Sequence, residues 1–314
     1  MIEVVEPGLL TSVQTAGGRP GWRHLGVPIG GAADSWSARL ANRLVGNPDD
    51  AALLELTLSG PELRFDAETA VALTGADFGA ILDGLPMPPY AGRPVRRGSL
   101  LRIGAGDGAR GYLAVAGGIQ VPSVLGSMST DLRSGFGGHE GRALRARDRL
   151  PVGTAAGSII SRWRGHMAAG PIRILPGPHH RQPDVDALVG ERWVVGTEAD
   201  RTGVRLDGRP IEAGAREVAS MGIAVGAIQV PPDGRPIVML ADRPVTGGYP
   251  VPACVIRADV GRVAALRTGD TVRFVAVSIE EARGALLAME EELADLVAAW
   301  ASDDDEVGWA GAHD

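Results

Sequence analysis

Charged side chains follow two apolar segments in the second half of the chain, Ala227–Val230 and Ile237–Leu240. Asp242 and Arg243 come after the second segment, and a Gly-Gly loop flanked by a threonine and a tyrosine comes next. A carboxylate can serve as a general base, and an arginine or the amides of a glycine loop can bind anionic oxygens. This combination indicates a candidate functional site, with an ordinary hairpin and a solvated tip as the alternative.

A second charged stretch, Thr197–Leu206, also lies between two apolar segments. The candidate bases from the two stretches are Asp242 and Asp200. The candidate substrate-binding residues are Arg201, Arg205, Gln229, Arg243, Thr246, Gly247, Gly248 and Tyr249. The alternative is that Asp200 with Arg205, and Asp242 with Arg243, form ion pairs of purely structural value.

The chain contains no lysine, so all 31 of its basic residues are arginines. This composition excludes a Schiff-base lysine, a Walker A motif, a kinase-type lysine and a covalently attached biotinyl-lysine. A nucleotide such as ATP would have to be bound by arginines, by backbone amides or by a second protein.

The remaining composition argues against several kinds of partner. Cys254 is the single cysteine, and the adjacent His179 and His180 would point to opposite faces of a strand, so we expect no metal site. The net charge is −7, but Glu280–Asp314 holds 11 acids and one arginine, which leaves the rest near neutral. We therefore expect no nucleic-acid partner. Without a membrane-length apolar run or a signal pattern, we expect no membrane partner and a cytoplasmic location.

The elements that must position these residues are mostly short strands. The chain has 45 Gly and 22 Pro, and apolar residues often recur at every second position, as at Leu54, Leu56 and Leu58. Thr11–Trp22 is rich in turn residues, and Val263–Leu266 fits a strand late in the chain. We predict a mainly β fold.

Two stretches have helical spacing instead. Trp36–Val45 follows Asp34 and Ser35, either of which can cap a helix, and it ends at a Gly-Asn-Pro sequence. Ser278–Trp300 is the one long helix that we predict, and Ser278 with Glu281 forms a capping box at its start.

The predicted organisation has four parts: a β domain over residues 1–165, a β-barrel domain over 166–278, a helix over 279–301 and an acidic, disordered tail over 302–314. Within the first domain, Gly117–Gly153 has the composition of a long ordered loop with a short strand at each end. A loop of this length indicates either a functional segment or an elaborate surface crossover.

Three segments together resemble a known family. They are VGNPDDAALLELTLSGPELRF, then GGIQVPSVLGSMST with GHEGRAL, and finally GAIQVPPDGRPIVMLADRPVTGGYP. They resemble the family called allophanate hydrolase subunit 2, KipA, or the C subunit of bacterial 5-oxoprolinase, which is similar to half of a biotin-dependent carboxyltransferase domain. Family members often have Asp where this chain has Thr15, and Arg where it has Met128.

The resemblance implies two β-barrel-like domains related to the cyclophilin-like fold and a shared site with a KipI-like subunit 1 partner. It also implies a heteromeric, ATP-dependent amidohydrolase, most simply one that opens 5-oxoproline to glutamate. ATP would be a co-substrate bound with the partner, and the substrate would be a small amide. Two alternatives stay open: a KipA-type binding protein that antagonises a kinase inhibitor, and a carboxyltransferase-like subunit for a urea derivative.

Overall fold

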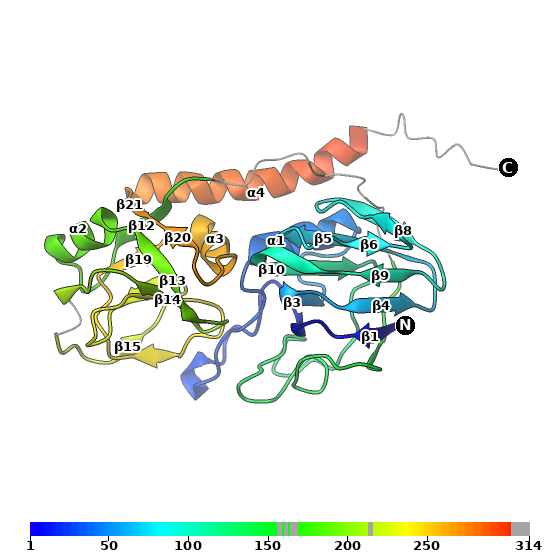
Figure 1. Cartoon of the computed structure of the whole chain (residues 1–314), viewed down its shortest axis with the longest axis horizontal. Coiled ribbons are helices and arrows are strands. Elements are labelled where there is room, and N and C mark those ends of the chain that lie inside the picture. Colours follow the sequence, from blue (N-terminus) through cyan, green and yellow to red (C-terminus); the bar gives the residue numbers. More distant parts are fainter. Residues whose placement is uncertain (156–158, 160–162, 164–168, 213–215, 303–314) are drawn as a thin grey trace.

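The computed structural model describes residues 1–155, 159, 163, 169–212 and 216–302. Two β lobes lie side by side, and one long helix crosses both of them (Figure 1). We call residues 1–155 the N-terminal lobe and residues 169–278 the C-terminal lobe. Helices make up 17% of the structure, which confirms the mainly β prediction.

The N-terminal lobe packs two sheets around a shared core. Their strand orders are β11-β1-β4-β9-β6-β7 and β2-β3-β10-β5-β8, with antiparallel pairing. The strands are β1 (Ile2–Glu6), β2 (Leu10–Gln14), β3 (Leu53–Ser59), β4 (Glu62–Phe65), β5 (Thr69–Gly75), β6 (Ile81–Leu82), β7 (Leu85–Pro86), β8 (Gly92–Val95), β9 (Leu100–Arg102), β10 (Ala105–Val115) and β11 (Arg149–Leu150). On β3, Leu54 and Leu56 enter the core between the sheets. Because side chains alternate along a strand, Glu55 points to the opposite face.

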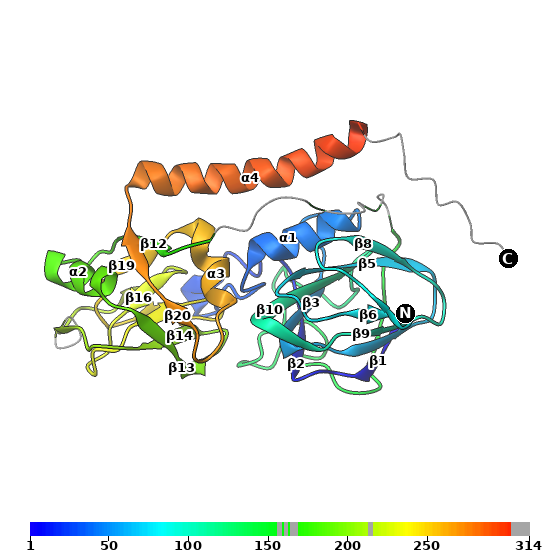
Figure 2. The same cartoon turned by 45° about the horizontal axis from the view of Figure 1, so that its top comes forward.

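Helix α1 (Ser35–Leu44) covers that opposite face of the five-stranded sheet (Figure 2). Asp34 caps it as predicted, since its carboxylate accepts hydrogen bonds from the backbone amides of Trp36 and Ser37, both at 3.1 Å. The helix buries its apolar stripe against small and aromatic side chains of the sheet, including Ala72 and Tyr112. A one-turn 3-10 helix, η1 (Arg23–Leu25), lies in the loop that precedes α1.

The C-terminal lobe is built on one eight-stranded sheet in the order β20-β13-β14-β17-β16-β19-β12-β21. Arg273 alone separates β20 from β21, so the chain passes from one edge of this sheet to the other and the sheet nearly closes into a barrel. The strands are β12 (Ile172–Pro176), β13 (Trp193–Ala199), β14 (Gly203–Asp207), β16 (Ala227–Gln229), β17 (Ile237–Met239), β19 (Ala253–Val255), β20 (Thr271–Val272) and β21 (Phe274–Ala276). A separate two-stranded sheet pairs β15 (Met221–Gly222) with β18 (Thr246–Gly247).

The hairpin predicted around Asp233-Gly234 is confirmed as the antiparallel pair β16–β17. Gly234 has a φ of +76°, the left-handed backbone conformation that this turn needs. The turn places the end of β17 next to the start of β14, and therefore brings Asp242 close to Arg201.

Several local expectations were wrong. The turn-rich stretch after Thr11 begins inside strand β2, and Val263–Leu266 overlaps helix α3 (Val260–Ala264) rather than a strand. Helix α2 (Gln182–Gly190) and the 3-10 helix η3 (Arg257–Asp259) were not predicted. The long loop has strand β11 near its end, but only an isolated bridge from Ile119 to Val152 near its start. The predicted domain boundary at residue 165 and the tail from residue 303 lie outside the described residues.

Helix α4 (Ile279–Ser302) confirms the prediction of a long C-terminal helix and its capping box. The Ser278 amide donates to Glu281 at 2.7 Å, and the Glu281 amide donates to the Ser278 hydroxyl at 3.1 Å. The helix begins over the C-terminal lobe and continues over α1 (Figures 1 and 2). There Leu293 is fully buried, and the indole N–H of Trp36 donates to the Met289 carbonyl at 3.2 Å.

We predict that Leu293→Ala loosens α4 from the N-terminal lobe, because it removes a fully buried side chain at that contact. A change of this kind costs about 2–5 kcal/mol where the cavity does not collapse. Hydrogen–deuterium exchange of α4 should rise accordingly. Leu287→Ala is the matched control, since Leu287 is 51% exposed on the same helix and its loss should leave exchange almost unchanged. Equal exchange in the two variants would contradict the packing described for α4.

Candidate functional site

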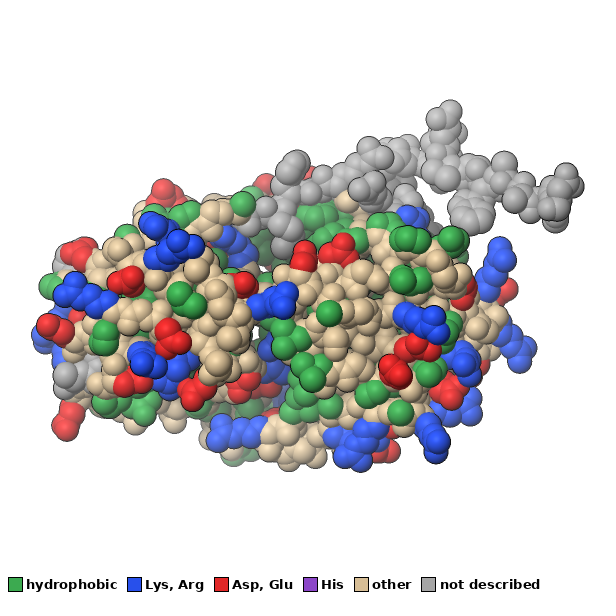
Figure 3. Space-filling model, in the orientation of Figure 1, with side chains coloured by type: hydrophobic (Ala, Val, Ile, Leu, Met, Phe, Trp, Pro, Cys, Tyr) green, Lys and Arg blue, Asp and Glu red, His purple; other side chains and the backbone are tan. Residues whose placement is uncertain are grey.

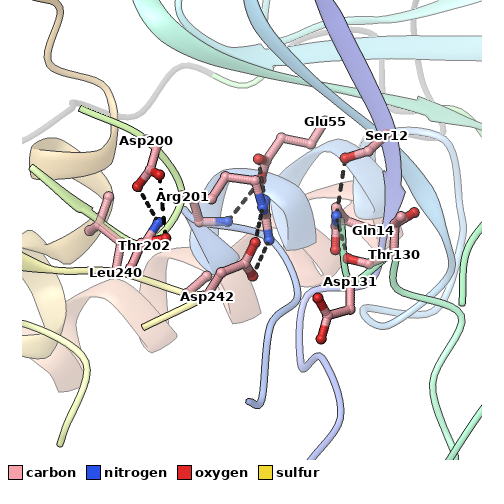
Figure 4. Close-up of polar contacts among 12 residues, drawn as sticks. Ser12, Gln14, Glu55, Thr130, Asp131, Asp200, Arg201, Thr202, Leu240 and Asp242 are labelled. Carbon is pink, nitrogen blue, oxygen red and sulfur yellow. Dashed lines mark hydrogen bonds and ion pairs between the residues drawn. The ribbon is translucent and has the colours of Figure 1, made fainter. Parts of the chain in front are cut away.

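The candidate site is organised around Arg201, a buried arginine in the turn between β13 and β14. Its Nε and Nη2 donate to the two carboxylate oxygens of Asp242 at 2.7 and 2.9 Å. Its Nη1 donates to Glu55 of β3, and its Nη2 also donates to the Gly31 carbonyl at 2.6 Å. Figure 4 shows Arg201 between Glu55 and Asp242. One side chain thus joins a carboxylate of each lobe.

Glu55 is the N-terminal partner in this network. It is 1% exposed, and its Oε2 accepts a hydrogen bond from the Ala33 amide at 2.8 Å. Arg110 of β10 adds a second positive charge, with 3.9 Å between its Nε and a Glu55 oxygen. Burial pushes the pKa of Glu55 upward, but Arg201 and Arg110 outweigh that effect and hold the pKa below its usual value. Glu55 is therefore ionised near neutral pH.

Asp242, the first candidate base, follows β17 and is mostly buried. Burial raises its pKa above the usual value, while Arg201 opposes that rise. Its backbone amide donates to the Arg201 carbonyl at 2.9 Å, so both the backbone and the side chain of Asp242 are fixed on Arg201. Each carboxylate oxygen has two lone pairs, and the hydrogen bond from Arg201 uses one of them. The second lone pair on each oxygen can still accept a proton or a hydrogen bond.

A cavity of about 320 Å³ lies between the lobes beside Asp242. From the C-terminal lobe it is lined by Asp242, Arg243 and Thr246, three of the predicted site residues. From the N-terminal lobe it is lined by part of the long Gly117–Gly153 loop, including Asp131 and Arg133. Figure 3 shows the boundary between the two lobes from outside, with arginine side chains along it. The cavity is large enough for a small molecule and presents both carboxylates and guanidinium groups.

Arg243 does not pair with Asp242. Its Nε donates to the Ile223 carbonyl at 2.9 Å, and its Nη1 donates to the Leu240 carbonyl at 3.2 Å. Burial, together with the nearby charges of Arg23 and Arg257, lowers the pKa of Arg243 to about 10. An arginine held by neutral carbonyls keeps its full charge for an anion near neutral pH, which suits the substrate-binding role predicted from the sequence.

The other predicted residues have varied surroundings. Asp200 is exposed, and its carboxylate accepts from the amides of Thr202 and Gly203 at 2.6 and 3.1 Å, so it shapes the turn that carries Arg201. Arg205 pairs with Glu198 and Asp233 rather than with Asp200. The structural pairings that the sequence suggested as an alternative are therefore both absent among the described residues.

The glycine loop lies over Gln229. A Cβ at position 247 would be 2.5 Å from Gln229 Nε2, so Gly247 is required for this approach. Gln229 is buried, and its Nε2 has no hydrogen-bond partner among the described residues. Thr246 and Gly247 form strand β18, while Gly248 and Tyr249 are exposed. The loop therefore lies at the rim of the site.

Sequence reasoning missed Glu55, Arg19 and Asp131. Glu55 alternates with leucines on β3, a pattern typical of a solvated strand face, whereas its partner Arg201 lies 146 residues away. Arg19 is fully buried, although it lies in a turn-rich stretch. This chain departs from the family pattern at Thr15 and Met128. Thr15 is buried and its amide donates to the Ser129 hydroxyl, and Met128 is half-buried against the core between the sheets.

In the part of the chain that the structure describes, no group of three or more His, Cys, Asp or Glu side chains could hold a metal ion. His180 instead contacts the Gly177 carbonyl through Nδ1 at 3.0 Å. No helix among the described residues has the length and apolar character to cross a bilayer.

Comparisons with known proteins cover nearly the whole chain. Residues 25–276 match the model of the carboxyltransferase domain, subdomain A and B. The chain is 40% identical to the C subunit of 5-oxoprolinase from Escherichia coli, over 90% of this chain and 93% of that protein. It is 34% identical to urea amidolyase of Saccharomyces cerevisiae, over 90% of this chain but 17% of that protein. The crystal structure of the K. lactis urea amidolyase superposes with a TM-score of 0.86 at 30% identity, over 94% of this chain and 20% of that one.

We predict that Glu55→Gln destabilises the protein by about 3 kcal/mol, because it removes one carboxylate from a buried ion pair and leaves the partner charge undercompensated. Glu62→Gln is the matched control on β4, the next strand along the chain, where Glu62 pairs with an Arg102 side chain that is 63% exposed. An exposed pair contributes about 1 kcal/mol at most. Urea denaturation measures both changes, and equal losses would contradict the role given to Glu55.

We also predict a pH dependence that Glu55→Gln removes. The pKa of Glu55 is lower in the folded protein than in the unfolded chain, so Glu55 contributes stability above its unfolded pKa of about 4.3. That contribution disappears as the pH falls through the folded value. The difference in unfolding free energy between wild type and Glu55→Gln should therefore be constant near neutral pH and should shrink in acid. A difference that grows in acid would contradict the direction of this pKa shift.

Proposed function

Because the chain belongs to the carboxyltransferase domain, subdomain A and B family, we propose that it is a subunit of a heteromeric, ATP-dependent amide hydrolase. The proposed reaction opens 5-oxoproline to glutamate. The observation that carries the proposal is the match to the C subunit of 5-oxoprolinase from E. coli, which covers 93% of that protein. A near-complete match at 40% identity favours a shared reaction more than the match to one part of a urea amidolyase does.

The chemistry asks for groups that the cavity between the lobes provides. A five-membered lactam is unreactive, and phosphorylation of its carbonyl oxygen by ATP makes the ring carbon electrophilic. One water then adds to this carbon, the ring C–N bond breaks with a proton moving to nitrogen, and a second water releases phosphate. These steps need a base for the water and positive groups for the anionic oxygens. We assign the base to Asp242 and the binding of anionic oxygens to Arg243 with the Thr246–Gly248 loop.

The proposal includes a partner, a subunit 1 protein of the KipI-like type, that closes over the cavity from outside. This chain has no lysine to bind the γ-phosphate of ATP, so the partner would bind most of the ATP molecule. It also has no lysine to which biotin could be attached. The cavity lies at a boundary between lobes, where a second protein can exclude water from the reaction. We place the complex in the cytoplasm, where ATP is available.

A urea-derivative carboxyltransferase is the second candidate, favoured by the 34% identity to urea amidolyase. The two candidates differ in the co-reactant: the first consumes ATP and releases glutamate, whereas the second exchanges a carboxyl group with a biotin carried by another chain. A KipA-type binding protein would do neither and would only sequester its partner.

We predict that the chain alone is inactive, and that the complex with its co-purifying partner releases glutamate from 5-oxoproline only when ATP is present. Asp242→Asn should lower the rate by about a hundredfold or more, because it removes the base while keeping the shape of the side chain. Asp233→Asn is the matched control, because Asp233 lies in the hairpin turn of the same lobe and its side chain is 48% exposed.

The outcomes separate the parts of this proposal. Assembly of the complex and its thermal unfolding must be measured for each variant, since Asp242→Asn also weakens the bidentate pair with Arg201. Full activity of an assembled Asp242→Asn complex would remove Asp242 as the base. A comparable loss in Asp200→Asn, with normal assembly, would assign the base to Asp200 instead. Activity of the lone chain would defeat the shared site.

A further inference from the structure

Two buried polar atoms near Asp242 have no partner among the described residues. The Arg19 side chain is fully buried: its Nη2 donates to the Ser129 carbonyl at 2.6 Å and its Nε to the Val124 carbonyl at 3.3 Å, but its Nη1 is unpaired. Asp131 is 4% exposed, and its Oδ1 accepts from the Ser134 amide at 2.9 Å, while its Oδ2 is unpaired. Buried donors and acceptors nearly always have partners, so each unpaired atom needs an explanation.

The two side chains belong to one compact arrangement. The guanidinium of Arg19 stacks over the ring of Phe136 at 4.6 Å, and the Phe136 carbonyl accepts from the Asp131 amide at 2.9 Å. Burial lowers the pKa of Arg19, and the carboxylates of Asp131 and Asp242 act in the opposite direction, which places both close to the guanidinium. Figure 4 shows Asp131 beside the Arg201 network, with no contact drawn from its carboxylate.

An open space adjoins the unpaired Arg19 atom. A Cβ built on Gly30 would have two neighbours within 4 Å, the Asp242 Oδ1 at 3.5 Å and the Arg19 Nη1 at 3.9 Å. The backbone here thus leaves room next to both the Arg19 donor and the candidate base. Asp131 and Asp242 both line the cavity of about 320 Å³. The unpaired Arg19 donor therefore lies close to Asp242, and the unpaired Asp131 acceptor lines the same cavity as Asp242.

We infer that Arg19 and Asp131 bind the amide edge of the substrate, with Arg19 Nη1 donating to the carbonyl oxygen and Asp131 Oδ2 accepting from the N–H. In a lactam or a urea the C=O and the N–H lie on the same side, whereas a trans peptide amide turns them to opposite sides. The pair therefore selects cis amides over open-chain peptides. It also places a positive charge at the oxygen on which negative charge develops.

This inference deepens the proposed function and rests on it for the choice of 5-oxoproline as the first ligand. It requires only a cis amide, so urea and 2-pyrrolidone are further probes. The decisive ligand is the lactone analogue of 5-oxoproline, in which a ring oxygen replaces the N–H. That oxygen can only accept a hydrogen bond, so it cannot pair with the Asp131 carboxylate.

The test is Asp131→Asn, measured by calorimetric binding of lactam and lactone to the full chain, alone and in its complex. Asn keeps the shape and an oxygen for the Ser134 amide, but it offers an NH₂ where Oδ2 was. Wild type should prefer the lactam by at least about tenfold, and Asp131→Asn should lose or reverse that preference, since an unpaired buried group is costly. Asp50→Asn is the matched control, because Asp50 also accepts from a loop amide, that of Gly17 at 2.7 Å, and does not line the cavity.

A second variant tests Arg19 without removing its charge. Gly30→Ala places a methyl group 3.9 Å from Arg19 Nη1 and 3.5 Å from Asp242 Oδ1, and should weaken lactam binding by at least about tenfold. Gly21→Ala is the matched control: Gly21 also has a positive φ, at +96°, in the same stretch, but nothing lies within 4 Å of its Cβ position. Unchanged binding in Gly30→Ala would overturn the role of Arg19.

The outcomes distinguish this inference from the proposed function. A lactam-to-lactone ratio that is the same in wild type and Asp131→Asn overturns the inference, even if the complex hydrolyses 5-oxoproline. Failure of wild type to bind any of the cis amides overturns it as well. Binding of a cis amide that depends on Asp131, in a complex without ATP-dependent glutamate release, supports the inference and removes 5-oxoprolinase as the function.

Discussion

One buried guanidinium, that of Arg201, joins charged groups of the two lobes. Arg201 belongs to the C-terminal lobe, yet it donates to Glu55 and to the Gly31 carbonyl of the N-terminal lobe. It also donates to Asp242 of its own lobe. Burying three charges together costs desolvation energy, and such clusters often add little net stability compared with an apolar core. The hydrogen bonds of such a cluster, however, are directional, and here they can all form only in one arrangement of the two lobes. We therefore attribute to Arg201 a role in fixing geometry more than in adding stability.

The cavity is a consequence of that arrangement. Asp242 reaches the boundary between the lobes because Arg201 holds both its side chain and its backbone there. Other contacts across the boundary act in the same direction: Arg23 donates to the Ile223 and Val245 carbonyls at 2.8 and 2.9 Å. The long loop contributes Asp131 from the facing side. A site assembled from both lobes in this way is sensitive to small changes in their angle, which helix α4 restrains by packing on both.

The sequence predicts the features that local chemistry determines. The Asp34 cap of α1, the capping box of α4 and the Asp-Gly hairpin depend on residues a few positions apart, and all three are found. The candidate residues at the end of β17 are predictable for the same reason, because charges after an apolar strand are a local pattern.

Glu55 and Arg19 could not be recognised in this way. Each is buried beside a hydrogen-bond partner more than 100 residues away. In the sequence Glu55 therefore resembles a residue on a solvated strand face, and Arg19 resembles a residue in a surface turn. Helix α3 was mistaken for a strand because the four apolar residues Val263–Leu266 carry no periodicity long enough to separate the two.

The absence of lysine fits this use of arginine. Arg201 meets four acceptor atoms on two lobes because its guanidinium spreads five N–H donors over a planar fork. A lysine ammonium has its three donors on one nitrogen, so it cannot grip Asp242 through both oxygens and reach Glu55 at the same time. The guanidinium groups of Arg19, Arg23 and Arg243 also donate more than one hydrogen bond each, in these cases to backbone carbonyls. Carbonyls hold a guanidinium in place without neutralising it, so Arg243 keeps its positive charge where it lines the cavity. The same residue type thereby connects the two lobes and provides the positive charge to which we assign the binding of anionic oxygens.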